Sequence, residues 1–129
     1  MNKTYKLIKE IIESWKYKVL EDDGEHLIIR YQMNVIHICP NEDDETFVTM
    51  ILPNFDEITE DNYSGIVIRC HKLNEKIKQI KFYTINDAII AASEFFYLGK
   101  DDLAFQMKLS LSNLIAAKVN YLKYENQEC

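Results

Sequence analysis

The sequence predicts an α+β domain in which helices pack against an antiparallel sheet. In three segments, apolar residues recur every three or four positions, as they do on one face of a helix. Between those segments lie short runs of β-branched and aromatic residues, separated by turn residues, as in antiparallel strands. Because helical and strand segments are grouped along the chain and do not alternate one by one, the α+β class is favoured over a parallel α/β fold.

The length of 129 residues suits one hydrophobic core, and half of it would be too short for an independent second core. We therefore expect a single domain over 1–129. Hydrophobic residues make up 47% of the chain, and only three Gly and two Pro occur, which excludes a disordered or low-complexity chain. No apolar run approaches the roughly 20 residues of a membrane-spanning helix, so we expect no membrane partner.

An amphipathic helix is expected over 3–16, with Asn2 or Thr4 capping its start. Its apolar face follows helical spacing and consists of Ile8, Ile11, Ile12, Trp15 and Val19. The end of this helix can be placed in two ways, because residues 15–21 also suit a strand.

Four antiparallel strands in a meander are expected next, over residues 17–21, 26–32, 35–39 and 46–52. Gly24 lies in an Asp-rich turn between the first two strands, where it can adopt a positive φ. Pro40 and Pro53 end the third and fourth strands, because proline has no N–H for the ladder. We expect a linker over 54–59.

A second helix is expected over about 60–79, with acidic residues near its start and lysines near its end, as the helix dipole favours. Its core face would consist of Ile66, Val67, Cys70, Leu73, Asn74 and Ile77. A last helix is expected over about 101–123, after Gly99. Its apolar face would consist of Leu103, Met107, Leu111, Leu114, Ile115 and Leu122.

Residues 88–98 allow two interpretations. As a helix, the segment would present one face formed by Ala88, Ala91, Ala92 and Phe95. As a strand, it would place on one side Ile89, Ala91, Ser93, Phe95 and Tyr97. The turn pair Asn86-Asp87 and the β-rich stretch before it favour a second hairpin. The order is then α-ββββ-α-ββ-α, and the simplest packing is a curved sheet with helices on one face.

Several stretches, in this order and spacing, resemble a known family: Trp15-Lys16-Tyr17 before Asp22-Asp23-Gly24, Phe47-Val48 to Leu52-Pro53-Asn54-Phe55, Leu73-Asn74 before Lys81-Phe82-Tyr83, and Glu94-Phe95-Phe96. The chain resembles the YbjN-like proteins, proposed bacterial sensory transduction regulators whose fold is that of type III secretion chaperones. The resemblance covers nearly the whole chain. It implies a small homodimeric fold that binds other polypeptides or acts in a regulatory pathway, and it carries over no catalytic residues.

Charge and cysteine content narrow the function classes. The net charge of −6 disfavours a nucleic-acid partner, and the acidic residues concentrate in 21–64, which holds 12 acidic residues and one basic residue. The three cysteines are widely spaced and odd in number, so we expect no disulfide framework. The first residues lack the unbroken apolar core of a signal peptide. These features favour a location in the reducing cytoplasm.

Metal and thiol chemistry is the weaker alternative. His37 and Cys39 share one face of a strand, and Cys70 and His71 are neighbours on a helix, so together they offer N and S ligands to zinc. Neither pair has a zinc-site spacing, and adjacent helical residues do not converge. The acidic run 42–45 lacks the pattern of a calcium loop and is expected to be a solvated turn. We therefore expect no catalytic residue, no metal and no cofactor.

Two groups of residues are candidates for a partner or dimer surface. Arg69, Lys72 and Lys76 have spacings of three and four, so they share one face of the second helix. They are either a solvated face or a contact with the acidic region of a second copy. The second group consists of Phe95, Phe96 and Tyr97. As a strand, this run puts a large ring on each side of the sheet, where it is covered by helices and loops or meets a partner.

We expect a non-enzymatic protein- or peptide-binding module, chaperone-like or regulatory, that acts as a homodimer with an unidentified polypeptide partner. The alternative is a regulator that binds a small ligand between the sheet and the last helix. A metal- or thiol-dependent enzyme is the least favoured hypothesis.

Overall fold

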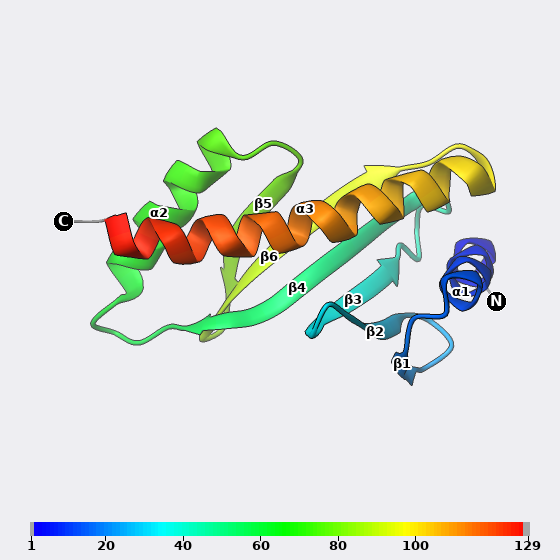
Figure 1. Ribbon diagram of the computed structural model, residues 1–129, viewed down its shortest axis with the longest axis horizontal. Helices are drawn as coiled ribbons and strands as arrows, with labels where there is room; N and C mark the ends of the chain where they lie inside the picture. The colour runs from blue at the N-terminus through cyan, green and yellow to red at the C-terminus, as the bar shows by residue number, and fades with distance from the viewer. Residues whose placement is uncertain (1, 128–129) are drawn as a thin grey trace.

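The computed structural model describes residues 2–127 and, within them, side chains other than those of residues 54, 55 and 125–127. Cys129 lies outside the described residues. The elements follow one another in the predicted order α-ββββ-α-ββ-α (Figure 1). Their bounds are α1 Lys3–Trp15, β1 Val19–Asp22, β2 Leu27–Tyr31, β3 Asn34–Pro40, β4 Phe47–Glu57, α2 Tyr63–Lys76, β5 Ile80–Ile85, β6 Ala88–Phe96 and α3 Gly99–Gln127.

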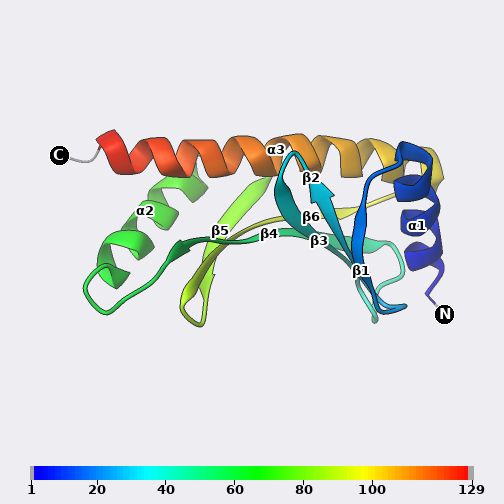
Figure 2. The ribbon, with the colours of Figure 1, turned by 60° about the horizontal axis from the view of Figure 1, so that its bottom comes forward.

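Six strands form one antiparallel sheet in the order β1-β2-β3-β4-β6-β5. The second hairpin joins the meander through β6, so β5 and β1 are the two edge strands. The long helix α3 lies along one face of this sheet, with α1 beside its start and α2 near its end (Figure 2). This is the predicted arrangement of a sheet with its helices on one face.

The core lies between the sheet and the helices. On β4, Val48, Met50 and Leu52 are buried, whereas the residues between them are only half-buried, as the alternation of a strand requires. Helix α3 contributes a line of fully buried residues at helical spacing: Leu103, Met107, Leu111, Leu114, Ala117 and Tyr121. The predicted apolar face of this helix is confirmed for Ile115, which is half-buried against the core, and is wrong for Leu122, which is exposed.

Helix α1 begins after Asn2, whose side-chain oxygen accepts hydrogen bonds from the backbone N–H groups of Thr4 (2.7 Å) and Tyr5 (3.1 Å). Of the two caps that the sequence allows, Asn2 is the one observed. The helix ends at Lys16, whose φ of 61° turns the chain into β1. Val19 belongs to that strand and is exposed, so its assignment to the helix face is wrong.

Strand β4 continues through Pro53 to Glu57, so the predicted linker over 54–59 is wrong for its first four residues. The register gives the reason. β3 pairs with β4 only as far as His37 and Ile51, while β6 continues to pair with β4 beyond that point. One side of β4 is then open, and a proline without an N–H is tolerated on such an open side.

Residues 88–96 form a strand, which settles the two interpretations in favour of the hairpin. In its turn, Asn86 has a φ of 54°, a left-handed conformation that Asn adopts more readily than most residues. The predicted inner side of β6 is buried against the helices. There the hydroxyl groups of Ser93 and Ser110 of α3 form a hydrogen bond of 2.8 Å.

Helix α2 is shorter at both ends than the predicted 60–79. Ile66, Cys70 and Leu73 are buried as predicted, but Val67 is exposed and Arg69 is buried. The buried face of this helix is therefore rotated around the helix axis relative to the predicted face, so that Arg69 faces the core.

None of the helices in the described part of the chain combines the length and the apolar character that crossing a membrane requires.

Candidate functional site

The face of the sheet that points away from the helices is apolar and uncovered in the described chain. One row across it, set by the strand register, runs from Ile28 through His37, Ile51 and Ala92 to Lys81. We call this surface the open face. Its non-charged residues include Ile28, Val35, His37, Cys39, Phe47, Thr49, Ile51, Pro53, Tyr83, Ile85, Ala88, Ile90, Ala92 and Phe96. In Figure 2, the helices lie on the other side of the sheet, and no described helix covers the strands on the open face.

An ion pair crosses the β5 side of the open face. Lys81 pairs with Ala92 in the strand register and forms a salt bridge with Glu94, the next residue of β6 on this face. Its ammonium group also lies 5.4 Å from the centroid of the Tyr83 ring. The long side chains shelter Ala92 and Ile90, which are buried although no helix covers them. Lys81 and Glu94 therefore form a polar margin beside an apolar centre.

Two aromatic rings mark one end of the open face. Phe47 and Phe96 pair in register across β4 and β6, and their ring centroids are 4.8 Å apart. Phe96 is 62% exposed. Phe95 and Tyr97, on the other side of the sheet, are buried, and the Tyr97 hydroxyl forms a 2.6 Å hydrogen bond with the Thr4 hydroxyl.

The split of Phe95, Phe96 and Tyr97 between the two sides of the sheet is thus as the strand interpretation predicts. Their joint assignment to a partner surface is wrong for Phe95 and Tyr97, because both rings are enclosed in the core. Only Phe96 is available to a partner.

The backbone edges of the sheet are protected. On the β5 edge, the Asn74 side chain of α2 accepts a hydrogen bond from the Phe82 N–H (2.6 Å) and donates one to the Phe82 carbonyl (3.0 Å). It therefore occupies the positions that an added strand would use. The opposite edge strand, β1, has only four residues and ends in Glu21 and Asp22, and short, charged edges resist pairing. A polypeptide would thus meet the open face more readily than an edge.

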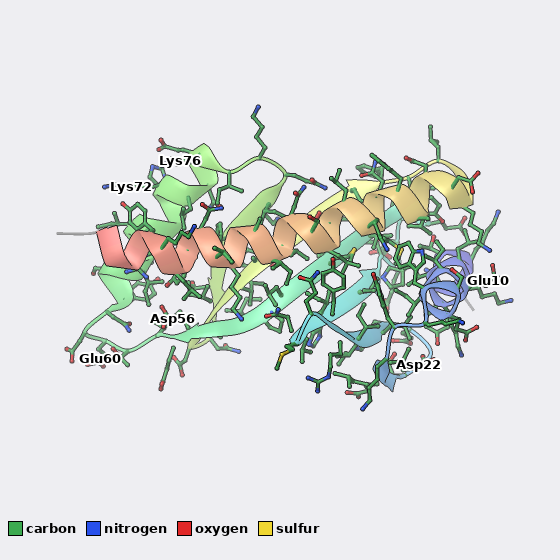
Figure 3. The ribbon with its side chains drawn as sticks, in the orientation of Figure 1. Glu10, Asp22, Asp56, Glu60, Lys72 and Lys76 are labelled. Carbon is green, nitrogen blue, oxygen red and sulfur yellow. The ribbon has the colours of Figure 1, made fainter. Side chains whose placement is uncertain are left out.

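The basic surface predicted on α2 is wrong for Arg69. Only 7% of Arg69 is exposed, and its guanidinium lies 3.8 Å from an Asp56 carboxylate oxygen and 4.8 Å from the centroid of the Tyr121 ring. Figure 3 shows Asp56 near the end of β4, on the side of α3. Lys72 and Lys76 are exposed and project outward from α2 (Figure 3). Their contact with a partner stays a prediction.

A sequence signal for the burial of Arg69 was present. Arg69 is three residues after Ile66 and four before Leu73, both of which face the core. Arginine is rarely buried without a partner. From the sequence alone, Arg69 is therefore assigned to the surface because of its charge, although its spacing places it on the core face of the helix. The partner, Asp56, lies 13 residues away on another element, and no local pattern links the two.

The residues offered as a metal or thiol site do not converge. His37 and Cys39 lie on the open face, whereas Cys70 belongs to the core cluster on the helix side. His71 is exposed and pairs with Glu75 at 2.9 Å. Within residues 2–127, no group of three or more His, Cys, Asp or Glu side chains is placed to hold a metal ion.

The thiols also lie in unreactive surroundings. Burial raises the pKa of the Cys39 thiol, and the Asp23 carboxylate adds to that shift. Burial raises the pKa of the Cys70 thiol to about 11, against a smaller opposing effect of Arg69. Both cysteines therefore remain thiols at neutral pH, and the thiolate is the reactive form.

His37 makes the stability of the sheet depend on pH. Burial lowers the pKa of its imidazole below 6.5, and nearby His26 adds to that effect while Glu21 opposes it. The unfolded chain then takes up this proton at a higher pH than the folded one, so stability falls as the pH drops below the unfolded value. We expect His37→Gln to retain more of its stability than the native chain between about pH 7 and pH 5. Urea unfolding at both pH values measures this, and equal losses in the two proteins would refute the role of His37.

Comparisons with known proteins agree on the fold. No protein-family model and no curated protein matches the sequence. Among solved structures, YbjN from E. coli, a proposed transcription regulator, aligns with a TM-score of 0.74 at 7% identity, over 93% of this chain and 92% of that one. An uncharacterized protein from Methanothermobacter thermautotrophicus aligns with a TM-score of 0.64 at 14% identity, over 96% of this chain and 97% of its own.

The third solved structure is the Yersinia pestis type III secretion chaperone SycH, in complex with a stable fragment of YscM2. It aligns with a TM-score of 0.61 at 14% identity, over 92% of this chain and 98% of that one. The fold expected from the resemblance is thereby confirmed: this chain has the fold that YbjN and the secretion chaperone share. At these identities the likeness concerns the fold alone.

Proposed function

We propose that the protein is a non-enzymatic module that holds an apolar segment of another polypeptide against the open face of its sheet, and that it acts as a homodimer. The observation that carries the proposal is the group of half-buried or exposed apolar side chains on the open face, among them Val35, Ile51, Ile85 and Phe96, which no helix of the described chain covers. Contiguous exposed apolar surface with a polar margin is typical of protein-binding sites. The likeness to the chaperone SycH, solved with a bound polypeptide fragment, supports a polypeptide as the occupant.

The shape of the open face fits an extended or helical segment better than a compact ligand. Its side chains present a shallow row of branched and aromatic groups, and the exposed ring of Phe96 supplies the kind of aromatic anchor that contributes most to binding. Lys81 and Glu94 at the margin can orient the segment through polar contacts.

The alternative of a ligand between the sheet and α3 has less support. That space is filled by one continuous cluster of buried side chains, which includes Ile89 of β6 and Leu111 of α3. The proposal includes a reducing compartment such as the cytoplasm, since Cys39 and Cys70 are free thiols.

Phe96→Ser should weaken binding of an unfolded polypeptide about tenfold, because the substitution removes an exposed aromatic anchor without opening the core. The probe is reduced, carboxymethylated α-lactalbumin, a polypeptide that stays unfolded, and the measurement is its dissociation constant by fluorescence anisotropy. Hydrogen exchange of the complex should show new protection on β3, β4 and β6.

Leu98→Ser is the matched control, because Leu98 is an even more exposed apolar residue that follows the end of β6 and lies outside the sheet. We expect native affinity for this variant. The proposal fails if the polypeptide does not bind, or if the two variants lose the same affinity.

A further inference from the structure

The solvent-facing line of α3 is apolar where a surface helix is normally polar. Ser112 lies at its middle, and the remaining exposed residues at helical spacing are Asp101, Phe105, Leu109, Ala116, Val119 and Lys123. Phe105 is 63% exposed, and together with the exposed Leu109 and Val119 it forms an apolar patch along the helix. We call this line the α3 seam. It lies on the side of α3 opposite the buried line that contacts the sheet.

Three other charged side chains of α3 turn away from the seam. Lys100 reaches Glu10 of α1 at 2.8 Å. The Lys108 ammonium lies 4.6 Å from the centroid of the Trp15 ring. Lys118 donates a 2.8 Å hydrogen bond to the side-chain oxygen of Asn34 on β3. Only the two ends of the seam carry charge, and these charges have opposite sign.

The seam is complementary to itself when two copies run antiparallel and cross at Ser112. Both copies rise by the same amount per residue, so seam residues at nearly equal distances before and after Ser112 then lie across from each other. Phe105 of one copy faces Val119 of the other, and the bulky half of each seam meets the smaller half of its partner. The acidic end faces the basic end, so that Asp101 lies opposite Lys123.

We propose that the α3 seam is the surface through which two copies of this chain associate, with their α3 helices antiparallel and crossing at Ser112. The inference deepens the homodimer of the proposed function and rests on it. Charge complementarity selects a second copy as the occupant, because the pairing of Asp101 with Lys123 is satisfied twice in one two-fold interface. Antiparallel helix dipoles add to the attraction.

This arrangement leaves the open face of each sheet on the far side of the dimer, available for a polypeptide. The paired segment, from Asp101 to Lys123, is about 33 Å long at 1.5 Å per residue. A single pair of helices of this length lies at the small end of specific interfaces, so we expect a dissociation constant of the order of micromolar.

A charge exchange tests the pairing. Asp101→Lys places two lysines opposite each other at both ends of the interface and should weaken dimerisation about tenfold by analytical ultracentrifugation. The double variant Asp101→Lys/Lys123→Asp restores opposite charges and should recover native association. Ile68→Glu, at an equally exposed apolar position of α2, is the control and should dimerise normally. A double variant no better than Asp101→Lys alone overturns the antiparallel register.

Disulfide trapping tests the crossing point. In a chain with Cys39→Ser and Cys129→Ser, the substitution Ser112→Cys should give a covalent dimer on oxidation, because Ser112 faces its own copy. Asn120→Cys, also exposed on α3, should not, because in the antiparallel register the two copies of position 120 lie about 24 Å apart on opposite sides of the crossing point. A native chain that stays monomeric at high concentration overturns both the seam and the homodimer. A dimer that Phe96→Ser disrupts and Asp101→Lys does not overturns the seam alone, and polypeptide binding is measured separately in either case.

Discussion

Arg69→Ala should lower the free energy of unfolding by about 3 kcal/mol, because it removes one partner of a largely buried ion pair. The guanidinium of Arg69 lies 3.8 Å from the Asp56 carboxylate and over the rings of Tyr121 and Tyr124, at 4.8 Å and 6.0 Å from their centroids. Its loss leaves a cavity between α2 and α3 and a carboxylate without its cation. The Asp56 side chain is 28% exposed, so water limits the penalty to the lower part of the range for buried pairs.

Lys72→Ala is the matched control, since Lys72 is the next basic residue on the same helix and is exposed. We expect a change within about 0.5 kcal/mol for this variant. Urea unfolding followed by circular dichroism measures both. Equal stabilities of the two variants would mean that Arg69 does not tie α2 to β4 and α3.

The Asp56 side of this cluster also involves Tyr121. The Tyr121 hydroxyl donates a 2.7 Å hydrogen bond to the Asp56 carboxylate. Burial and the bonded carboxylate together raise the pKa of this phenol well above its ordinary value, so Tyr121 remains a neutral donor at any physiological pH. The cluster therefore holds the end of β4, α2 and α3 together through the Arg69–Asp56 ion pair and the Tyr121 hydrogen bond.

Asn74→Ala should cost about 2 kcal/mol of stability, because two hydrogen bonds to the Phe82 backbone are lost at once. The amide hydrogen of Phe82 should then exchange faster than in the native chain, since its N–H no longer has the Asn74 oxygen as acceptor. The variant should also self-associate on heating, because the β5 edge becomes free to pair with another strand.

Asn113→Ala serves as the comparison for this second substitution. Asn113 also donates from its side-chain amide, but to the exposed side chain of Gln79 and not to the backbone. Its replacement should change stability by no more than about 0.5 kcal/mol and leave the exchange of Phe82 unaffected. Native exchange at Phe82 in Asn74→Ala would contradict the role of Asn74 in closing the edge.

Much of the fold follows from local chemistry. The spacing of Ile8, Ile11 and Ile12 marks α1, and the turn at Asn86 marks the second hairpin, because helical and strand periodicities and turn conformations are properties of a few consecutive residues. The class and the element order are readable in the same way. The extension of β4 beyond Pro53 cannot be read from the local sequence, because it depends on where β3 stops pairing with β4.

The candidate site is less predictable for the same reason. The sequence indicates that rings of the run Phe95–Tyr97 point to both sides of a sheet, but which side is covered depends on where α3 packs. Arg69 shows the limit most clearly. Its charge marks it as a surface residue, and only the approach of Asp56 and Tyr121 from other elements makes its burial favourable.

Local sequence is enough to establish the order of helices and strands and the aromatic and aliphatic groups available to the sheet, because these depend on neighbours along the chain. Packing between elements sets which face of the sheet stays uncovered, which of the basic residues on α2 is buried and which line of α3 meets solvent. Those outcomes depend on contacts between residues far apart in the chain, and the energy of a buried charge or an exposed ring is set by such contacts.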